Sequence, residues 1–264
     1  MNDFDPEKYW EERLSKDYGL QSVGYLGLGK CYNKWLYRIR SRIFRRLVKT
    51  LDVELSSMNV LDIGSGTGFY INEWKQQDIR TITGSDITDI AIKNLKANFP
   101  DDTFHRMDIG APIPEQPDNR YDIISAFDVL YHIVDDDRYK QAIRNIYSML
   151  RDDGYFILSD NFLHKETLRG MHQVCHTLST IEDILNQTGF RIVKRVPMFI
   201  LMNYPCDSDS RILRLFWKVL SLLITRGELF GFMVGGILYP LEMILTRILK
   251  ESPTTEIMIC RRTS

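Results

Sequence analysis

Short apolar runs alternate with amphipathic stretches through most of the chain. Runs of the length of a buried strand occur at 59–64, 81–87, 121–129, 154–160, 189–196 and 255–262. Stretches with apolar residues at helical spacing lie between them at 68–76, 89–98, 136–150 and 179–188. Buried strands that alternate with helices are typical of a parallel sheet covered on both faces. The pattern therefore predicts an α/β core.

Two regions depart from this alternation. Residues 30–51 are expected to form a long amphipathic helix, preceded by a short helix at 6–15. Residues 204–250 insert about fifty apolar, helix-favouring residues where a short turn would connect two strands. We therefore expect four parts, namely an N-terminal helical cap (1–50), a core (51–203), an apolar helical insertion (204–250) and the final strand of the core (251–264).

Composition and charge exclude only a few classes of protein. The 264 residues carry a formal net charge of -1, which lacks the basic bias of a nucleic-acid-binding protein. Four scattered cysteines without a CxxC pair argue against a zinc knuckle or a disulfide framework and suit a reducing compartment. The first residues lack the apolar core of a signal peptide, and no uninterrupted apolar run reaches the roughly 18 residues of a membrane span. We expect a cytoplasmic protein that does not bind nucleic acid.

A glycine-rich turn follows the first predicted strand. Gly64, Gly66 and Gly68 permit a tight turn and the close approach of a ligand to the backbone. Their spacing differs from the G-x-G-x-x-G of dinucleotide-binding folds, and no phosphate-loop lysine follows. Asp62 precedes the turn, where a carboxylate would repel a pyrophosphate but tolerate an ammonium or a sulfonium. The turn favours a ligand with a positively charged, phosphate-free tail.

Two more carboxylates follow later strands. Asp86 ends the second predicted strand, where a carboxylate can accept hydrogen bonds from both hydroxyls of a ribose. Asp108 comes after the next helix-to-strand unit and could accept from an adenine amino group, with Ile87 and Ile109 flanking the ring. Each carboxylate by itself could equally be a cap or turn residue. Together with the turn they describe an adenosine whose tail carries positive charge.

Five segments, in this order and spacing, resemble the class I S-adenosylmethionine (SAM) dependent methyltransferases: VLDIGSGTG, SDI, MDIG, YDIISAFDVLYHI and LRDDGYFILSD. The resemblance implies a Rossmann-like, seven-stranded, mostly parallel sheet with helices on both faces and an antiparallel last strand. It also implies SAM as cofactor and S-adenosylhomocysteine as product. The residues that it assigns to the cofactor are Asp62, Gly64, Ser65, Gly66, Gly68, Asp86, Ile87, Asp108, Ile109 and Phe127.

Three histidines are candidates for a general base if the acceptor is a hydroxyl. His132 follows the fourth predicted strand, at the carboxyl edge where ligands bind in such sheets. His172 and His176 lie four residues apart, a spacing that can also bind metal on a helix face, but no third ligand is evident and we expect no metal. Each histidine could instead be a packing residue. The expected substrate contacts are Tyr131, Tyr25 and Asn161.

The sequence indicates the identity of the methyl acceptor less clearly than that of the cofactor. The basic helix 30–49 and the apolar stretch 211–250 are compatible with a lid over an apolar acceptor, with a dimer surface, or with peripheral membrane contact. We expect methyl transfer to a small, fairly apolar acceptor, with O-methylation of a natural product as the first hypothesis. A lipid or prenylated acceptor at the membrane surface and a SAM-binding protein without turnover are the alternatives.

Overall fold

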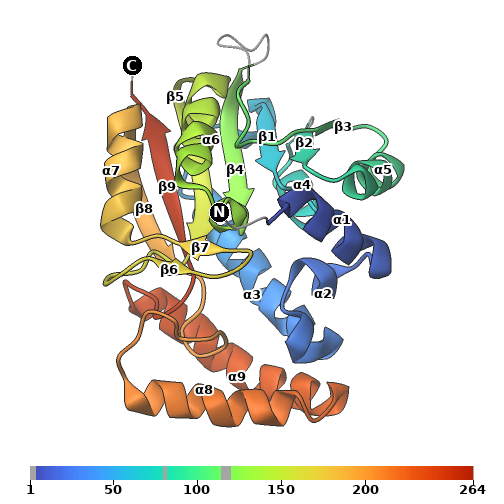
Figure 1. Cartoon of the computed structure of the whole chain (residues 1–264), viewed down its shortest axis with the longest axis vertical. Helices are drawn as coiled ribbons and strands as arrows, with labels where there is room; N and C mark the ends of the chain where they lie inside the picture. Colours follow the sequence, from blue (N-terminus) through green and yellow to red (C-terminus); the bar gives the residue numbers. More distant parts are fainter. Residues whose placement is uncertain (1–3, 80–81, 114–119, 264) are drawn as a thin grey trace. The chain divides into compact units, whose positions relative to one another are not determined.

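The computed structural model describes residues 4–79, 82–113 and 120–263. Within these ranges a seven-stranded sheet has the order β3-β2-β1-β4-β5-β9-β8, and β6 and β7 pair separately (Figure 1). The strands are β1 (Val60–Ile63), β2 (Ile82–Asp86), β3 (Thr103–Arg106), β4 (Tyr121–Phe127), β5 (Leu150–Asp160), β6 (Leu168–Arg169), β7 (Val174–Cys175), β8 (Phe190–Pro197) and β9 (Glu256–Arg262).

The first five strands of the large sheet are parallel, as the alternation of runs predicts. β1 pairs with β2 and β4, β2 with β3, and β4 with β5, all in parallel register. The last strand, β9, lies between β5 and β8 and runs opposite to β4 (Figure 1). The predicted seven-stranded, mostly parallel Rossmann-like sheet is therefore confirmed. All carboxyl ends of the parallel strands meet at one edge, which is where ligands bind in such folds.

Helices connect most of the strands, and they also make up the two regions that depart from the alternation of strands and helices. They are α1 (Pro6–Lys16), α2 (Leu20–Val23), α3 (Gly29–Val48), α4 (Phe69–Lys75), α5 (Asp89–Asn98), α6 (Asp136–Met149), α7 (Leu178–Thr188), α8 (Arg211–Ile224) and α9 (Glu228–Ile248), with 3-10 turns η1 (Leu26–Leu28), η2 (Leu55–Ser57) and η3 (Leu130–His132). Capping determines several of their ends. Asp135 accepts from the N–H groups of Asp137 and Arg138 at the start of α6, and Gly189 ends α7 in the left-handed conformation.

The chain divides into two compact units. The sheet unit comprises Met1–Lys16, Val53–Lys194 and Met258–Ser264, and the helical unit comprises Asp17–Asp52 and Arg195–Ile257. In the core of the sheet unit, buried side chains of α6 and α7, such as Ile143 and Leu185, pack against those of the sheet, such as Phe156 of β5. This apolar core leaves the strand ends free to carry polar groups.

Small residues hold the helical unit together along α3 and α9. A Cβ atom at Gly235 would lie 2.2 Å from Cδ1 of Trp35, and one at Gly231 would lie 3.3 Å from Cβ of Tyr32. The indole N–H of Trp35 donates to the Phe232 carbonyl oxygen at 3.0 Å. Glycine therefore allows α9 to approach α3 more closely than any side chain would permit.

Candidate functional site

The glycine turn between β1 and α4 requires glycine for two physical reasons. Gly64, Gly66 and Gly68 have φ angles of 68°, 51° and 83°, in the left-handed region that other residues seldom adopt. A Cβ atom at Gly64 would also lie 2.3 Å from Cγ2 of Val129. Ser65 donates its backbone N–H to the carbonyl oxygen of Ser85 at 2.8 Å, which fixes the turn to β2. The turn thus presents bare backbone at the carboxyl edge of the sheet.

Asp62 lies in β1, directly below this turn, and is almost completely buried. Ser125, its register partner on β4, donates to Oδ1 of Asp62 at 2.6 Å. The indole N–H of Trp74 donates to Ser125 Oγ at 3.0 Å and so orients that hydroxyl. Burial raises the pKa of Asp62 to about 7, although the hydrogen bond from Ser125 opposes the shift. Ser125 and Trp74 were not predicted, because the pairing of β1 with β4 brings Ser125 to Asp62 and the packing of α4 brings Trp74 to Ser125.

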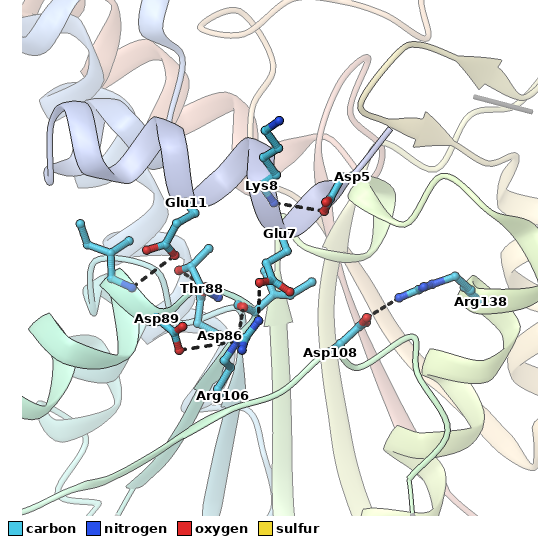
Figure 2. Close-up of polar contacts among 12 residues, drawn as sticks. Asp5, Glu7, Lys8, Glu11, Asp86, Thr88, Asp89, Arg106, Asp108 and Arg138 are labelled. Atoms are coloured by element: carbon cyan, nitrogen blue, oxygen red, sulfur yellow. Dashed lines mark hydrogen bonds and ion pairs between the residues drawn. The ribbon is translucent and has the colours of Figure 1, made fainter. Parts of the chain in front are cut away.

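Asp86 ties the end of β2 to the glycine turn. Its Oδ2 accepts from the backbone N–H of Gly66 at 2.9 Å. Its Oδ1 accepts from the N–H and the hydroxyl of Thr88, at 3.0 and 2.8 Å (Figure 2). Burial raises the pKa of Asp86, while these hydrogen bonds favour its charged form. The backbone N–H of Ile87 also favours the charged form, so the carboxylate is held at the end of β2, beside the glycine turn.

Three buried carboxyl groups at this edge lack a cation. Asp62, Asp86 and Asp160, at or near the ends of β1, β2 and β5, form no ion pair in the part of the chain that the structure describes. Burial raises the pKa of Asp160 to about 7, and its Oδ2 has no hydrogen-bond partner. An unpaired buried carboxylate is unfavourable, and a bound cation would offset that cost. The edge therefore fits a ligand with positive charge.

Asp108 already has a protein partner. Its Oδ2 forms an ion pair with Arg138 of α6 (Figure 2). Its Oδ1 accepts from the N–H of Gly110 at 3.0 Å. Ile109 is buried in the core of the sheet unit, while Ile87 is half-buried. The assignment of these three residues to an adenine stays a prediction. The ion pair between Asp108 and Arg138 was not expected from the sequence.

Helix α1 is fixed to the same edge by two polar contacts. Glu7 forms an ion pair with Arg106, and Glu11 Oε2 accepts from the N–H of Ile90 at 3.3 Å (Figure 2). These contacts position the aromatic residues Tyr9 and Trp10 within the sheet unit. The sequence led us to expect a helical cap in this region, but not these two contacts, because their partners are about ninety residues away.

His132 and His172 come together, and Trp10 joins them. The Nδ1–H of His132 donates to the His172 carbonyl oxygen at 2.9 Å, which leaves Nε2 as the nitrogen that can accept a proton. The two imidazoles stack at 5.9 Å between centroids, and Trp10 packs edge-on against His132 at 4.9 Å. Burial lowers the pKa of His132 to about 4, so its ring is neutral near pH 7. Tyr9 stacks on His172 at 5.2 Å.

His176 lies apart from that cluster. It is buried, its ring is 4.6 Å from that of Tyr139, and its Nε2 is 3.9 Å from Oδ1 of Asp136. Burial lowers the pKa of His176. Asn161 donates to the Sγ atom of Cys175 at 3.1 Å. No group of three or more His, Cys, Asp or Glu residues suited to a metal ion occurs in the described ranges.

The remaining predicted residues are aromatic and fall into both units. Phe127, at the end of β4, stacks on Tyr70 of α4 with 3.9 Å between centroids. Tyr131 is half-buried and lies beside His132, at 4.5 Å between rings. Tyr25 belongs to the helical unit, where its hydroxyl accepts from Asn203 Nδ2 at 2.8 Å. Tyr70 was not predicted, since a tyrosine in a helix gives no signal of a partner on a strand.

Comparison with protein families gives a match over most of the sheet unit. The model of a family described as "Methyltransferase domain" matches residues 34–195. A ribosomal protein L11 methyltransferase of Staphylococcus haemolyticus is 28% identical over 141 residues, which cover 51% of this chain and 43% of that protein. The chain thus spans less than half the length of that relative.

Solved structures agree at the level of the fold. The magnesium protoporphyrin IX methyltransferase ChlM of Synechocystis, with bound SAM, superposes with a TM-score of 0.59 at 18% identity and covers 98% of both chains. A SAM-dependent methyltransferase of Leishmania major gives a TM-score of 0.60 at 13% identity, covering 98% of this chain and 85% of that one. Both resemble this chain along nearly its whole length.

Proposed function

Because the chain belongs to the methyltransferase-domain family and is a SAM-dependent methyltransferase, we propose that it methylates an oxygen of a small, fairly apolar acceptor, such as a natural product. The observation that carries this proposal is the cluster of His132, His172 and Trp10 in the sheet unit. Aromatic rings offer apolar contact area to an acceptor. The histidine offers a nitrogen that can take the hydroxyl proton.

The buried carboxyl groups would hold the cofactor. Asp62 would interact with the methionyl ammonium, which favours the ionised form of a carboxyl whose pKa burial raises to about 7. Asp86 would accept hydrogen bonds from the ribose hydroxyls while keeping the Gly66 turn in place. When bound, the cofactor supplies a methyl group that its sulfonium makes electrophilic.

His132 would act on the acceptor as general base. Its Nδ1–H is fixed by the His172 carbonyl, so Nε2 is the nitrogen that would remove the proton from the acceptor hydroxyl. With a pKa lowered to about 4, the ring stays neutral, and therefore able to accept a proton, throughout the physiological range. Because a base is most efficient when its pKa lies near the operating pH, a base this weak requires an acceptor hydroxyl that ionises easily, such as that of a phenol or an enol.

The test is the His132→Ala variant, measured on a phenolic acceptor found by screening hydroxylated metabolites with labelled SAM. We expect kcat to fall about 100-fold, the lower end for loss of a general base, with unchanged affinity for SAM. His105→Ala, an exposed histidine on β3, is the matched control and should keep full activity. If His132→Ala turns over at the wild-type rate, the base assignment is wrong.

The pH profile gives a second readout of the same role. The acidic limb of kcat/KM should lie near pH 4, where His132 becomes protonated, and not near the ordinary histidine pKa of about 6.5. A limb near pH 6.5 that disappears in His132→Ala would contradict the lowered pKa. It would show that His132 titrates like an ordinary exposed histidine.

A lipid or prenylated acceptor is the second candidate. The observation that favours it is the exposed apolar surface of α8 and α9, which includes Ile212, Leu215, Met233, Ile237 and Ile248. The similar proteins do not indicate which kind of acceptor this chain uses. The Synechocystis protein is named for a small molecule, and the staphylococcal protein is named for a ribosomal protein. Turnover of a prenylated phenol in vesicles, compared with its short-chain soluble analogue, separates the two. Faster turnover of the short analogue supports the first proposal.

A further inference from the structure

Helix α9 has one face that nothing in the helical unit covers. In the described part of the chain α9 is the one helix long and apolar enough to cross a membrane by length and composition, and only 22% of its apolar window is buried. Its exposed residues Met233, Ile237, Leu241, Ile244 and Ile248 recur every three or four positions and so share one side of the helix. Ile237 alone is 70% exposed.

The opposite side of α9 is fixed to the rest of the unit. Gly231, Gly235, Glu242 and Thr246 are its buried residues, and they also recur at helical spacing. Glu242 accepts from three consecutive backbone N–H groups, those of residues 200–202. Helix α9 therefore cannot leave the unit to span a bilayer without breaking these contacts. Its exposed side is available only as a surface.

Helix α8 repeats this arrangement and adds charge. Its exposed apolar residues Ile212, Leu215, Val219 and Leu222 recur every three or four positions, and Ile212 is 83% exposed. Arg211, Arg214 and Lys218 each directly precede one of the first three, so they form a cationic row beside the apolar one. The helix contains no acidic residue. A cationic row along an exposed apolar face is typical of helices that lie in a membrane interface.

A second cationic row comes from α3. Lys30, Lys34, Arg38 and Arg42 are exposed at intervals of four residues, on one side of that helix. The guanidinium of Arg38 lies 5.3 Å from the ring centroid of Tyr239 on α9, which brings this row to the edge of α9. Cations therefore accompany the apolar residues on α8 and along α9.

We propose that the helical unit binds the surface of a membrane that contains anionic lipids, through the exposed apolar residues of α8 and α9. The cations of α3 and α8 contact the lipid headgroups, while α9 lies along the interface. A second copy of the chain fits less well, because a symmetric pair would bring like-charged rows together. The binding does not depend on the acceptor, so its failure leaves the proposed methyl transfer untouched.

The experiment is flotation of the full chain with two kinds of vesicle, pure phosphatidylcholine and an equimolar mixture of phosphatidylcholine and phosphatidylserine. We expect the chain to float with the mixed vesicles and far less with the neutral ones. Ile237→Glu should weaken that binding at least about tenfold, because it puts a charge into the apolar contact. Val193→Glu is the matched control, since Val193 is 50% exposed but lies on β8 in the sheet unit. It should bind like the wild type.

The cationic contribution has its own variants. Lys218→Gln should weaken binding to the mixed vesicles about fivefold, the effect of one basic residue near an anionic surface, and Lys34→Gln should do the same. Lys93→Gln, which removes an exposed lysine of α5 in the sheet unit, should have no effect. Equal binding to both kinds of vesicle would overturn the role of the cations.

Light scattering distinguishes a second copy from a membrane. The proposal is overturned if the wild-type chain stays with the soluble fraction on both kinds of vesicle, or if it is a dimer that Ile237→Glu converts to a monomer. It is supported if the wild-type chain floats, Ile237→Glu does not, and both have the same mass in solution and the same circular dichroism spectrum.

Discussion

Asp62 in the sheet unit and Glu242 in the helical unit are both almost completely buried, yet their surroundings differ. Glu242 accepts from three backbone N–H groups of residues 200–202, at 2.7 to 3.3 Å. Asp62 accepts from the hydroxyl of Ser125 and has no cation beside it in the described chain. Glu242 thus accepts a full row of backbone donors from its own unit, whereas Asp62 has fewer donors and lies near the carboxyl edge of the sheet.

This difference teaches that burial by itself does not identify a ligand-binding carboxyl. Three N–H donors stabilise the charge of Glu242 and connect α9 to the segment before it, so its role is structural. Burial raises the pKa of Glu242 as well, although its three N–H donors oppose that shift. Asp62 and Asp160 have fewer hydrogen-bond donors, and burial raises their pKa values to about 7. The number of donors, and not the raised pKa, is what distinguishes these two carboxyl groups from Glu242.

The largest expected effect tests the structural carboxyl. Glu242→Ala leaves three buried N–H groups without an acceptor, and we expect the free energy of unfolding to fall by about 3 kcal/mol or more. Urea unfolding followed by circular dichroism measures the loss. Glu251→Ala, which removes a carboxyl that is 59% exposed, is the matched control and should cost less than about 1 kcal/mol.

The same variant also tests the contrast between the units. SAM affinity, measured by titration calorimetry below the unfolding temperature, should stay within about twofold of the wild type, because Glu242 accepts from backbone N–H groups of the helical unit, whereas the glycine turn and Asp86 belong to the sheet unit. The comparison would be wrong if Glu242→Ala had normal stability but no longer bound SAM. Glu242 would then be a ligand-binding carboxyl and not a structural one.

The next effect concerns the ribose carboxyl. Asp86→Ala removes an ionised acceptor of two ligand hydrogen bonds, and we expect SAM affinity to fall about 100-fold. Calorimetry measures it, and Asp86→Asn, which keeps one acceptor oxygen, should lie between the two. Asp89→Ala, three residues further and exposed, is the control and should bind normally. Wild-type affinity in Asp86→Ala would remove Asp86 from the site.

The smallest effect is a pH dependence. Asp62 is ionised above its pKa of about 7, and a cationic ligand binds the ionised form, so SAM affinity should fall as the pH decreases from 7 to 5. One coupled proton gives at most about a tenfold loss per pH unit. Asp62→Asn should bind weakly and without this slope, whereas Asp160→Asn should retain it. A slope that survives in Asp62→Asn assigns the titration to another group.

Much of the site was predictable because its residues lie close to strand ends in the sequence. Gly64, Gly68 and Asp86 follow apolar runs directly, so parallel pairing brings them to one edge. The contact of Trp10 with His132 and the ion pair of Arg138 with Asp108 were not predicted, because α1 and α6 reach these residues only through contacts between distant positions in the chain. The spacing of apolar residues along the chain does not indicate such long-range contacts. His176 shared its spacing with His172 but turned towards Tyr139.

The alternating α/β pattern and the glycine turn could be predicted from the sequence alone, because they depend on short-range spacing and on side-chain chemistry. The seven-stranded sheet and SAM as cofactor were implied by the resemblance to the SAM-dependent methyltransferases. The hydrogen-bond donors of each buried carboxyl group became known only from the three-dimensional structure, since bonds such as those from residues 200–202 to Glu242 join distant segments. The structure also decided which apolar residues of α8 and α9 are covered. Whether a residue is buried depends on the elements that pack against it, so the sequence of one helix does not determine which of its apolar residues are covered.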